Sequence, residues 1–280
     1  MRKVTKIWLI IASILVVVGV SVFGGVMVDL NWDFNKLSTT QLVENSYGIS
    51  AEFHDINVQV READVLFYRT DDDEVAVVCR TFEDEPVVEV IGGVLVVQVN
   101  DARPWYEKIG IHFESPKVAI YLPDGEYGKL THRSETGDCV VSGGSCFESI
   151  DISLRTGSAF CWASSKGAVN MSTTTGEIRL GGESAKTVKL ETTTGAVSLW
   201  DVIAEEIIIA GTTGKVYMEA CDAHKIKVSV TTGDVECSFL TPKAVSAHTT
   251  TGNVSVPDSN SGGSCSITTV TGDIEVAIKE

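Results

Sequence analysis

Basic residues are scarce in this chain of 280 residues, which has 22 Lys and Arg against 38 Asp and Glu and a formal net charge of −16. Residues 29–130 carry a net charge of −12 and residues 131–280 a net charge of −7, whereas residues 1–28 carry +3. Nucleic-acid binding depends on Lys and Arg that neutralise phosphates. The composition therefore argues against nucleic acid as a partner, and we expect everything after residue 28 to be repelled by anionic lipid.

The chain also lacks the residue spacings of a metal or redox site. Its seven cysteines contain no Cys-x-x-Cys pair, which excludes a zinc ribbon or a thioredoxin-like motif. The five histidines share no ligand spacing and are His54, His112, His132, His224 and His248. We expect no metal site and no cofactor.

Motifs of the common catalytic sites are missing as well. There is no G-x-S-x-G turn, no P-loop and no dinucleotide-binding glycine pattern. We expect a protein that is not an enzyme. A carbohydrate-active enzyme on such a fold would need clustered carboxylates. The repeat does not place carboxylates together, so this enzyme class is the least favoured alternative.

What the sequence does have at its start is a long apolar run. Ile7–Val28 is 22 residues without a charge, preceded by Arg2, Lys3 and Lys6. As a helix this run would be about 33 Å long, enough to cross a hydrocarbon core of about 30 Å. It predicts a retained transmembrane helix with residues 1–6 in the cytoplasm and the acidic remainder outside. A cleaved signal peptide is the alternative, which the length of the run disfavours.

A glycine preceded by one to three threonines then recurs through the second half of the chain. The spacings are 20, 19, 19, 19, 19, 19 and 20 residues, and the glycines are Gly137, Gly157, Gly176, Gly195, Gly214, Gly233, Gly252 and Gly272. Apolar residues stand two and four positions after each glycine and five and seven positions before all but the first, with mostly polar residues between them. Alternation on both sides of a turn predicts two short strands per repeat, each with one buried face.

A unit of about 19 residues cannot bury such a face alone, but stacked units about 4.8 Å apart can. We therefore predict an all-β fold, a β-solenoid of about 19-residue coils over residues 131–280. An antiparallel sandwich would need pairs of hairpin turns instead. Residues 46–130 read as an irregular β-rich N-terminal cap and residues 29–45 as a tether. Cysteines 139, 161, 237 and 265 fall at inward positions, where Cys acts as a small hydrophobe.

One group of outward positions has the character of a recognition site. Trp162 and Trp200 both lie five residues after a repeat glycine, and Gly181 holds that position in the coil between them. The two indoles should stand roughly 10 Å apart. Phe160 and Tyr217 lie two positions nearer the turn, with Arg179 between them. These five side chains form a candidate surface for a glycan or a partner protein. The competing interpretation is that the tryptophans cover a bend of the strand.

The apolar N-terminal run, the segment Ser115–Pro123 and the TTTGxVxL repeats together resemble a bacterial family. It is the putative-adhesin, β-strand-repeat family of envelope proteins, common in Firmicutes, and the resemblance covers about residues 45–280. It implies a solenoid-like extracytoplasmic domain and no catalytic residues.

Two functions remain open at this point. The favoured one is a non-enzymatic, membrane-anchored binding or scaffolding module that faces outside and contacts cell-wall glycan or another envelope protein. The alternative is a structural polymer that stacks through the solenoid ends, because the last strand, at residues 273–280, has no evident cap and uncapped edges invite pairing.

Overall fold

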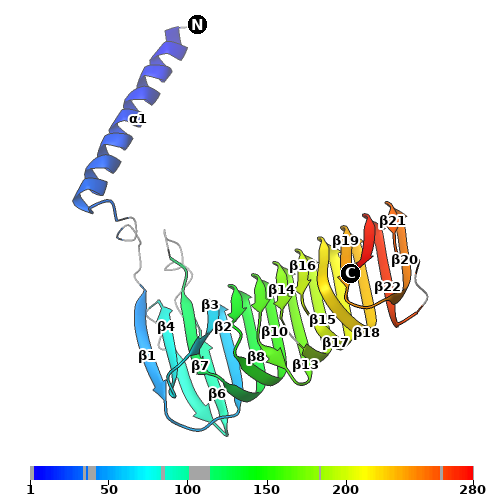
Figure 1. The fold of residues 1–280 in the computed structure, drawn as a ribbon. Helices are drawn as coiled ribbons and strands as arrows, with labels where there is room; N and C mark the ends of the chain where they lie inside the picture. The colour runs from blue at the N-terminus through cyan, green and yellow to red at the C-terminus, as the bar shows by residue number, and fades with distance from the viewer. Residues whose placement is uncertain are drawn as a thin grey trace. The chain divides into compact units, whose positions relative to one another are not determined.

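The computed structural model describes residues 3–33, 36, 42–82, 86–100, 114–182, 184–258 and 261–279 (Figure 1). These fall into two units, one of Met1–Gln41 with Arg103–Ser115 and the other of Leu42–Ala102 with Pro116–Glu280. The first unit contains the helix, and the second contains all the described strands. Residues 34, 35 and 37–41 of the predicted tether at residues 29–45 lie outside the described residues.

The helix α1 spans Lys3–Asp29 and contains the predicted apolar run. Its segment Thr5–Asp29 has a mean hydropathy of 2.7 and is long and apolar enough to cross a membrane. Such a helix near an N-terminus suggests membrane anchoring, and a signal sequence has the same features.

The second unit consists of 23 strands. The first seven are β1 (Val43–Ile49), β2 (Asp55–Glu62), β3 (Asp64–Thr70), β4 (Val75–Thr81), β5 (Val87–Ile91), β6 (Val94–Val99) and β7 (Lys117–Pro123). The next twelve are β8 (Gly125–Thr136), β9 (Cys139–Val141), β10 (Ser145–Thr156), β11 (Ala159–Cys161), β12 (Ser164–Ser165), β13 (Ala168–Thr175), β14 (Ile178–Gly181), β15 (Ser184–Thr194), β16 (Val197–Trp200), β17 (Ile203–Thr213), β18 (Val216–Thr232) and β19 (Val235–Phe239). The last four are β20 (Lys243–Thr251), β21 (Val254–Ser255), β22 (Gly263–Thr271) and β23 (Ile274–Ile278).

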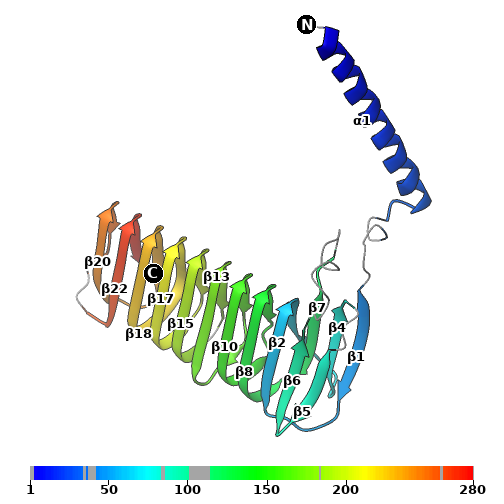
Figure 2. The ribbon, with the colours of Figure 1, turned by 180° about the vertical axis from the view of Figure 1, so that it is seen from behind.

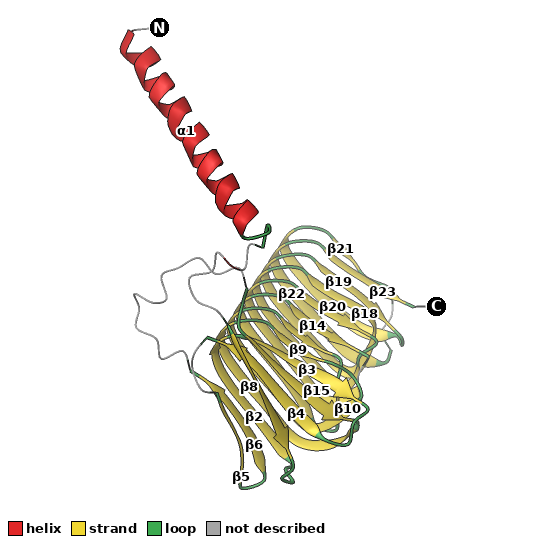
Figure 3. Ribbon diagram, turned by 90° about the vertical axis from the view of Figure 1, so that its left-hand side faces the viewer, coloured by secondary structure: helices red, strands yellow, loops and turns green. Residues whose placement is uncertain are grey.

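Each repeat glycine separates a strand of one sheet from a strand of the other. Sheet B holds the strands before the glycines, in the spatial order β5, β6, β2, β8, β10, β13, β15, β17, β18, β22, β20, and Figure 2 shows this order. Sheet A holds the strands after them, in the order β1, β4, β7, β3, β9, β11, β14, β16, β18, β19, β23, β21. Figure 3 shows the coils stacked one behind the next.

The pairing between coils is parallel and joins equivalent residues, as the repeat predicts. In sheet B, Ile150 faces Val169, which faces Val188, and the same column continues through Ile207 and Ile226. These side chains are 0–1 % exposed, so the inward columns of the two sheets fill one continuous core. The β-solenoid fold is therefore confirmed.

The repeat glycines occupy a backbone position that other residues rarely adopt. Their φ angles lie between 131° and 153°. A Cβ added to Gly176 would stand 1.9 Å from the carbonyl oxygen of Gly157 in the preceding coil. The glycines thus stack directly on one another, and both the left-handed conformation and the close approach require the absence of a side chain.

At the N-terminal end the ladder includes a coil that precedes the glycine repeat. Val65 pairs with Cys139 and Glu62 with Thr136, across 74 residues of sequence. Ala63 takes the turn position, because a Cβ on Gly137 would meet the Ala63 carbonyl oxygen. Strands β2 and β3, within the segment predicted as a cap, therefore continue the parallel ladder, while β1, β4 and β5 close this end with antiparallel pairs.

At the other end the expected order of the coils is wrong. The last strand, β23, pairs with β19 on one side and with β21 on the other, so it lies inside the sheet. Its companion β22 likewise lies between β18 and β20. The final coil is inserted one place back, and the edge of the solenoid is formed by β20 and β21 (Figure 1). The C-terminal segment is therefore not the exposed edge that the sequence suggested.

Candidate functional site

The five predicted site residues lie on the outward face of sheet A, over β11, β14, β16 and β18. Phe160 is directly opposite Arg179, and Gly181 is directly opposite Trp200. Tyr217 is separated from Arg179 by Ser198 on β16. The register thus gives the arrangement that the spacing predicts.

The aromatic side chains touch in two pairs. The ring centroids of Phe160 and Trp162 are 6.2 Å apart, and those of Trp200 and Tyr217 are 6.3 Å apart. The Arg179 guanidinium lies 5.0 Å from the Phe160 ring centroid, within cation–π distance. Trp162 is 40 % exposed, so one indole offers a large accessible surface.

Gly181 makes room for the Trp162 indole. A Cβ on Gly181 would stand 3.1 Å from Trp162 Nε1 and 3.2 Å from its Cδ1. The indole therefore lies over the glycine of the next coil, on the side toward Trp200. Both tryptophans also stand at the end of their strands, since Trp162 follows β11 and Trp200 is the last residue of β16. They are placed at a corner of the coil and remain accessible there.

The polar groups of this surface are paired with one another. Arg179 donates two hydrogen bonds of 2.8 Å to the Glu177 carboxylate, one to each oxygen. Tyr217 donates from its hydroxyl to Glu219 at 2.9 Å, and this hydrogen bond raises the pKa of Tyr217. The Tyr217 phenol is therefore neutral at physiological pH, and the surface is suited to stacking more than to ionic contact.

Two further aromatic residues continue the same column and were missed in the sequence. Tyr68 pairs with Tyr121, and Ser142 stands in register between Tyr68 and Trp162. The rings of Tyr68 and Tyr121 stack at 5.4 Å. We call Tyr121, Tyr68, Trp162 and Trp200 the aromatic row. Only the pairing of β3 with β9, across 74 residues, brings its two halves together; no local spacing reveals it.

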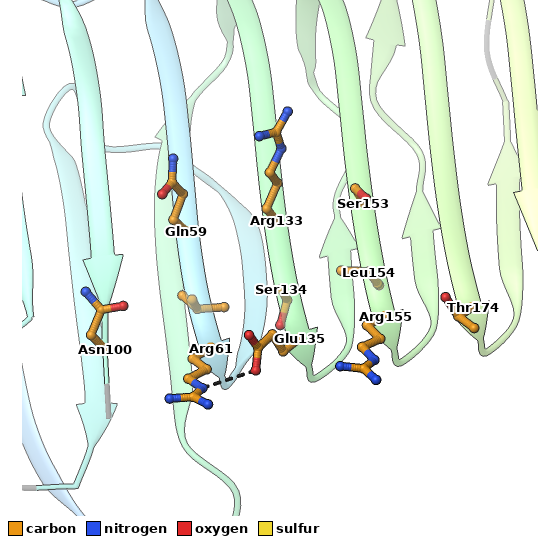
Figure 4. Close-up of a pocket in the computed structure, with 11 residues that line it drawn as sticks. Gln59, Arg61, Asn100, Arg133, Ser134, Glu135, Ser153, Leu154, Arg155 and Thr174 are labelled. Carbon is orange, nitrogen blue, oxygen red and sulfur yellow. Dashed lines mark hydrogen bonds and ion pairs between the residues drawn. The ribbon is translucent and has the colours of Figure 1, made fainter. Parts of the chain in front are cut away.

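Sheet B has a different outward face, with an open cavity of about 550 Å³ over β6, β2, β8 and β10 (Figure 4). Its charged lining residues are Arg61, Arg133, Glu135 and Arg155. We call this cavity the cationic groove. Arg61 and Arg155 stand two positions before their turn, where the five coils from Gly176 to Gly252 have threonine, and this departure is the signal that sequence reasoning overlooked.

The part of the chain that the structure describes offers neither a cluster of metal ligands nor a thiol that is readily ionised. It contains no group of three or more His, Cys, Asp or Glu placed to hold a metal ion. The seven cysteines, all among the described residues, form no disulfide bond, and six of them are buried. Burial raises the pKa of Cys79 and of Cys221 to about 11 and that of Cys265 to about 12, so these thiols stay protonated.

The comparison with protein families decides the assignment. The model of the family described as Toastrack DUF4097 matches residues 53–280. The chain belongs to the Toastrack DUF4097 family. The match begins just before β2, so it includes the coil that precedes the glycine repeat. No curated protein matches the chain.

Solved structures share the Toastrack fold at low sequence identity. One is a putative adhesin from Bacteroides fragilis NCTC 9343, with 14 % identity and a TM-score of 0.53 over 84 % of this chain and 97 % of that one. Another is a putative lipid binding protein from Parabacteroides distasonis ATCC 8503, with 14 % identity and a TM-score of 0.52 over 85 % of this chain and 97 % of that one. At this identity the similarity shows the fold alone.

Proposed function

We propose that this Toastrack protein is a non-enzymatic binding or scaffolding module, anchored in the cell membrane by residues 7–28 with the solenoid outside. The adhesin name of the Bacteroides fragilis structure is compatible with such a module. The observation that carries the proposal is the aromatic row, four aromatic side chains in one outward column of sheet A.

The spacing of the row suits a linear glycan. Tyr68, Trp162 and Trp200 lie on alternate strands, about 10 Å apart at the ~4.8 Å spacing of paired strands. This strand spacing is roughly the length of two sugars, and Ser142, between Tyr68 and Trp162, adds only a small side chain to the row. A sugar ring stacks on an aromatic face through its C–H groups and excludes water there. The ligand class we propose is therefore a neutral or weakly charged cell-wall glycan.

The binding test uses the full-length chain in detergent micelles and chitin hexasaccharide as the probe. The double variant Trp162→Ala, Trp200→Ala should lose at least tenfold in affinity, whereas Trp32→Ala, which removes an exposed tryptophan from the other unit, should change it less than twofold. A double variant with native melting temperature and native affinity would contradict the glycan site. A sharp fall in melting temperature would instead assign the indoles to packing of the corner.

The orientation has its own test. Arg2, Lys3 and Lys6 precede the apolar run, and positive residues stay on the cytoplasmic side of a first helix. Protease added to intact protoplasts should therefore degrade residues 29–280. Protection of this region until the membrane is lysed would refute the outward orientation.

A structural polymer is the second candidate, and the exposed edge of β20 favours it. Among the described residues β20 pairs only with β22, and its nine residues contain no Asp or Glu. Val245 and Ala247 of this strand are half-buried, and Val254 of β21 is 44 % exposed. An edge strand without acidic residues, in a chain of net charge −16, can meet a second copy without repulsion between carboxylates. A detergent-solubilised protein that sediments as a monomer at all concentrations would eliminate this function.

A further inference from the structure

We propose that the cationic groove on sheet B is a second binding site, independent of the aromatic row, which takes a linear anionic glycan through Arg133 and Arg155. The groove has three arginines and one glutamate among its lining residues, a local charge of +2 in a chain of net charge −16.

Two of the three guanidinium groups are available to a ligand. Arg61 donates to Glu135, with 3.1 Å between Arg61 Nε and Glu135 Oε2. Arg133 and Arg155 have exposed side chains and no ion pair or hydrogen bond to any other described residue. Figure 4 shows Arg133 pointing along β8 away from the turn and Arg155 lying near the turn, with the floor of the groove between them. Guanidinium groups bind carboxylates and phosphates in bidentate geometry.

The groove continues along the solenoid axis. A second open cavity of about 380 Å³ shares Ser153, Leu154 and Thr174 with the first and extends to Ser229 on β18. Its lining is mostly small and hydroxylic, apart from Glu191. The two cavities together extend over eight neighbouring strands, about 34 Å at the ~4.8 Å spacing of paired strands. A track of this length and shallow floor fits an extended polymer.

The polar character of the track favours a glycan over a peptide. From β6 to β18 every strand that it crosses is paired on both sides, so a peptide cannot add to the sheet by backbone hydrogen bonds. The serine and threonine hydroxyls can donate to and accept from sugar hydroxyls instead.

The negative charge of the whole chain limits how dense the charge on the ligand can be. A polymer with one anion every few ångströms, such as a nucleic acid, would be repelled beyond the groove. A glycan with about one carboxylate or phosphate for every two sugars can pair with Arg133 and Arg155 and meet few other charges.

The experiment measures binding to the full-length chain in detergent micelles at low ionic strength. The carboxylate probe is a hyaluronan octasaccharide, with one carboxylate per disaccharide, and the phosphate probe is a synthetic octasaccharide with one phosphodiester per disaccharide. Arg133→Gln with Arg155→Gln should weaken binding of the preferred probe at least tenfold. The control Lys117→Gln with Lys186→Gln, two exposed lysines outside the groove, makes the same change in net charge and should weaken it less than twofold.

The probe that binds more tightly identifies carboxylate or phosphate as the anion. Failure of the native chain to bind either probe, or equal losses in the two double variants, would overturn the proposal. Arg133→Lys with Arg155→Lys keeps the charge and should retain part of the affinity even if the Gln variants fold poorly. Because the aromatic row is on the other sheet, the arginine variants should leave chitin hexasaccharide binding unchanged. If the native chain does not bind chitin hexasaccharide, the proposed function fails, but the test of the cationic groove is unaffected.

Discussion

The two sheets of the solenoid share one interior but have different outward faces. Sheet A presents aromatic side chains, with Trp162 at 40 % and Tyr68 at 40 % exposure. Sheet B presents small hydroxylic residues and the arginines of the cationic groove. The inward columns must pack against the coil before and the coil after, so their residue types repeat. The outward columns are not constrained by packing in this way, so their residue types can differ between the two sheets.

The largest expected effect on stability compares an inward residue of sheet A with an outward one. Val235 is 0 % exposed on β19, and its neighbour Glu236 points outward. Val235→Asp buries a charge without a partner, so we expect the free energy of unfolding to fall by about 4 kcal/mol or more. Glu236→Gln, which gives up only an exposed ion pair with Lys215, should change it by about 0.5 kcal/mol or less. Chemical denaturation of both variants measures the difference, and equal effects would contradict the inward and outward assignment.

The second effect concerns the interior of sheet B, where His132 replaces the usual apolar residue. It is 0 % exposed, its Nδ1 lies 3.3 Å from the Val58 carbonyl oxygen, and its Nε2 has no partner among the described residues. Burial lowers the pKa of His132 to about 4 from the ordinary 6.5. The unfolded chain therefore binds a proton below pH 6.5 that the folded chain refuses until about pH 4.

Stability should consequently decrease by about 3 kcal/mol as the pH falls from 6.5 to 4, and level off below that. His132→Leu should remove this part of the pH dependence, whereas His248→Leu, on the partly exposed edge strand β20, should not. Denaturation curves at several pH values provide the measurement. An unchanged pH profile in His132→Leu would show that the imidazole is not held neutral in the core.

The third effect compares two neighbouring threonines of sheet B. Thr173 is 5 % exposed and donates from its hydroxyl to the Gly157 carbonyl oxygen at 2.9 Å, whereas Thr174 points outward into the groove. Thr173→Val leaves that carbonyl without its side-chain donor and should cost about 1 kcal/mol. Thr174→Val should cost less than about 0.5 kcal/mol. Thermal melting separates the two variants, and a larger loss in Thr174→Val would mean that the outward hydroxyls stabilise the coil.

The sequence predicts those features that recur in every coil. The glycine turns and the inward residues follow from local geometry, so the fold and the positions of Trp162, Trp200, Phe160, Arg179 and Tyr217 could be derived. The order of the terminal coils could not, because the turns at Gly252 and Gly272 have the same local pattern and either could occupy the edge. Which coil is inserted depends on long-range packing.

The full extent of the candidate sites was also beyond local reasoning. Tyr68 joins the aromatic row only because β3 pairs with β9 across 74 residues, with strands β4 to β8 between them in the sequence. Arg61 approaches Glu135 by the corresponding pairing of β2 with β8. Ala63, which replaces the repeat glycine in this coil, hides the coil from a search for the period.

The smallest expected effect on stability compares a glycine in each sheet. Neither Gly181 of sheet A nor Gly211 of sheet B has the left-handed backbone that alanine avoids. A Cβ on Gly211 would meet the Val230 and Thr192 methyl groups at 3.8 Å and 3.9 Å, ordinary contact distances. Gly211→Ala should therefore stabilise the protein by about 0.5 kcal/mol, since alanine restricts the unfolded chain.

Gly181→Ala restricts the unfolded chain in the same way, but its Cβ would stand 3.1 Å from Trp162 Nε1. The indole must therefore move by a few tenths of an ångström. Its melting temperature should stay within about 2 °C of native, consistent with a near-zero net free-energy change. The tryptophan fluorescence should nevertheless shift, and binding of chitin hexasaccharide should weaken severalfold, because the accessible face of Trp162 is displaced. Gly211→Ala should change neither signal. Should Gly181→Ala leave fluorescence and binding native, the indole would not rest on this glycine, and the outward face of sheet A would lose the feature that sets it apart from sheet B.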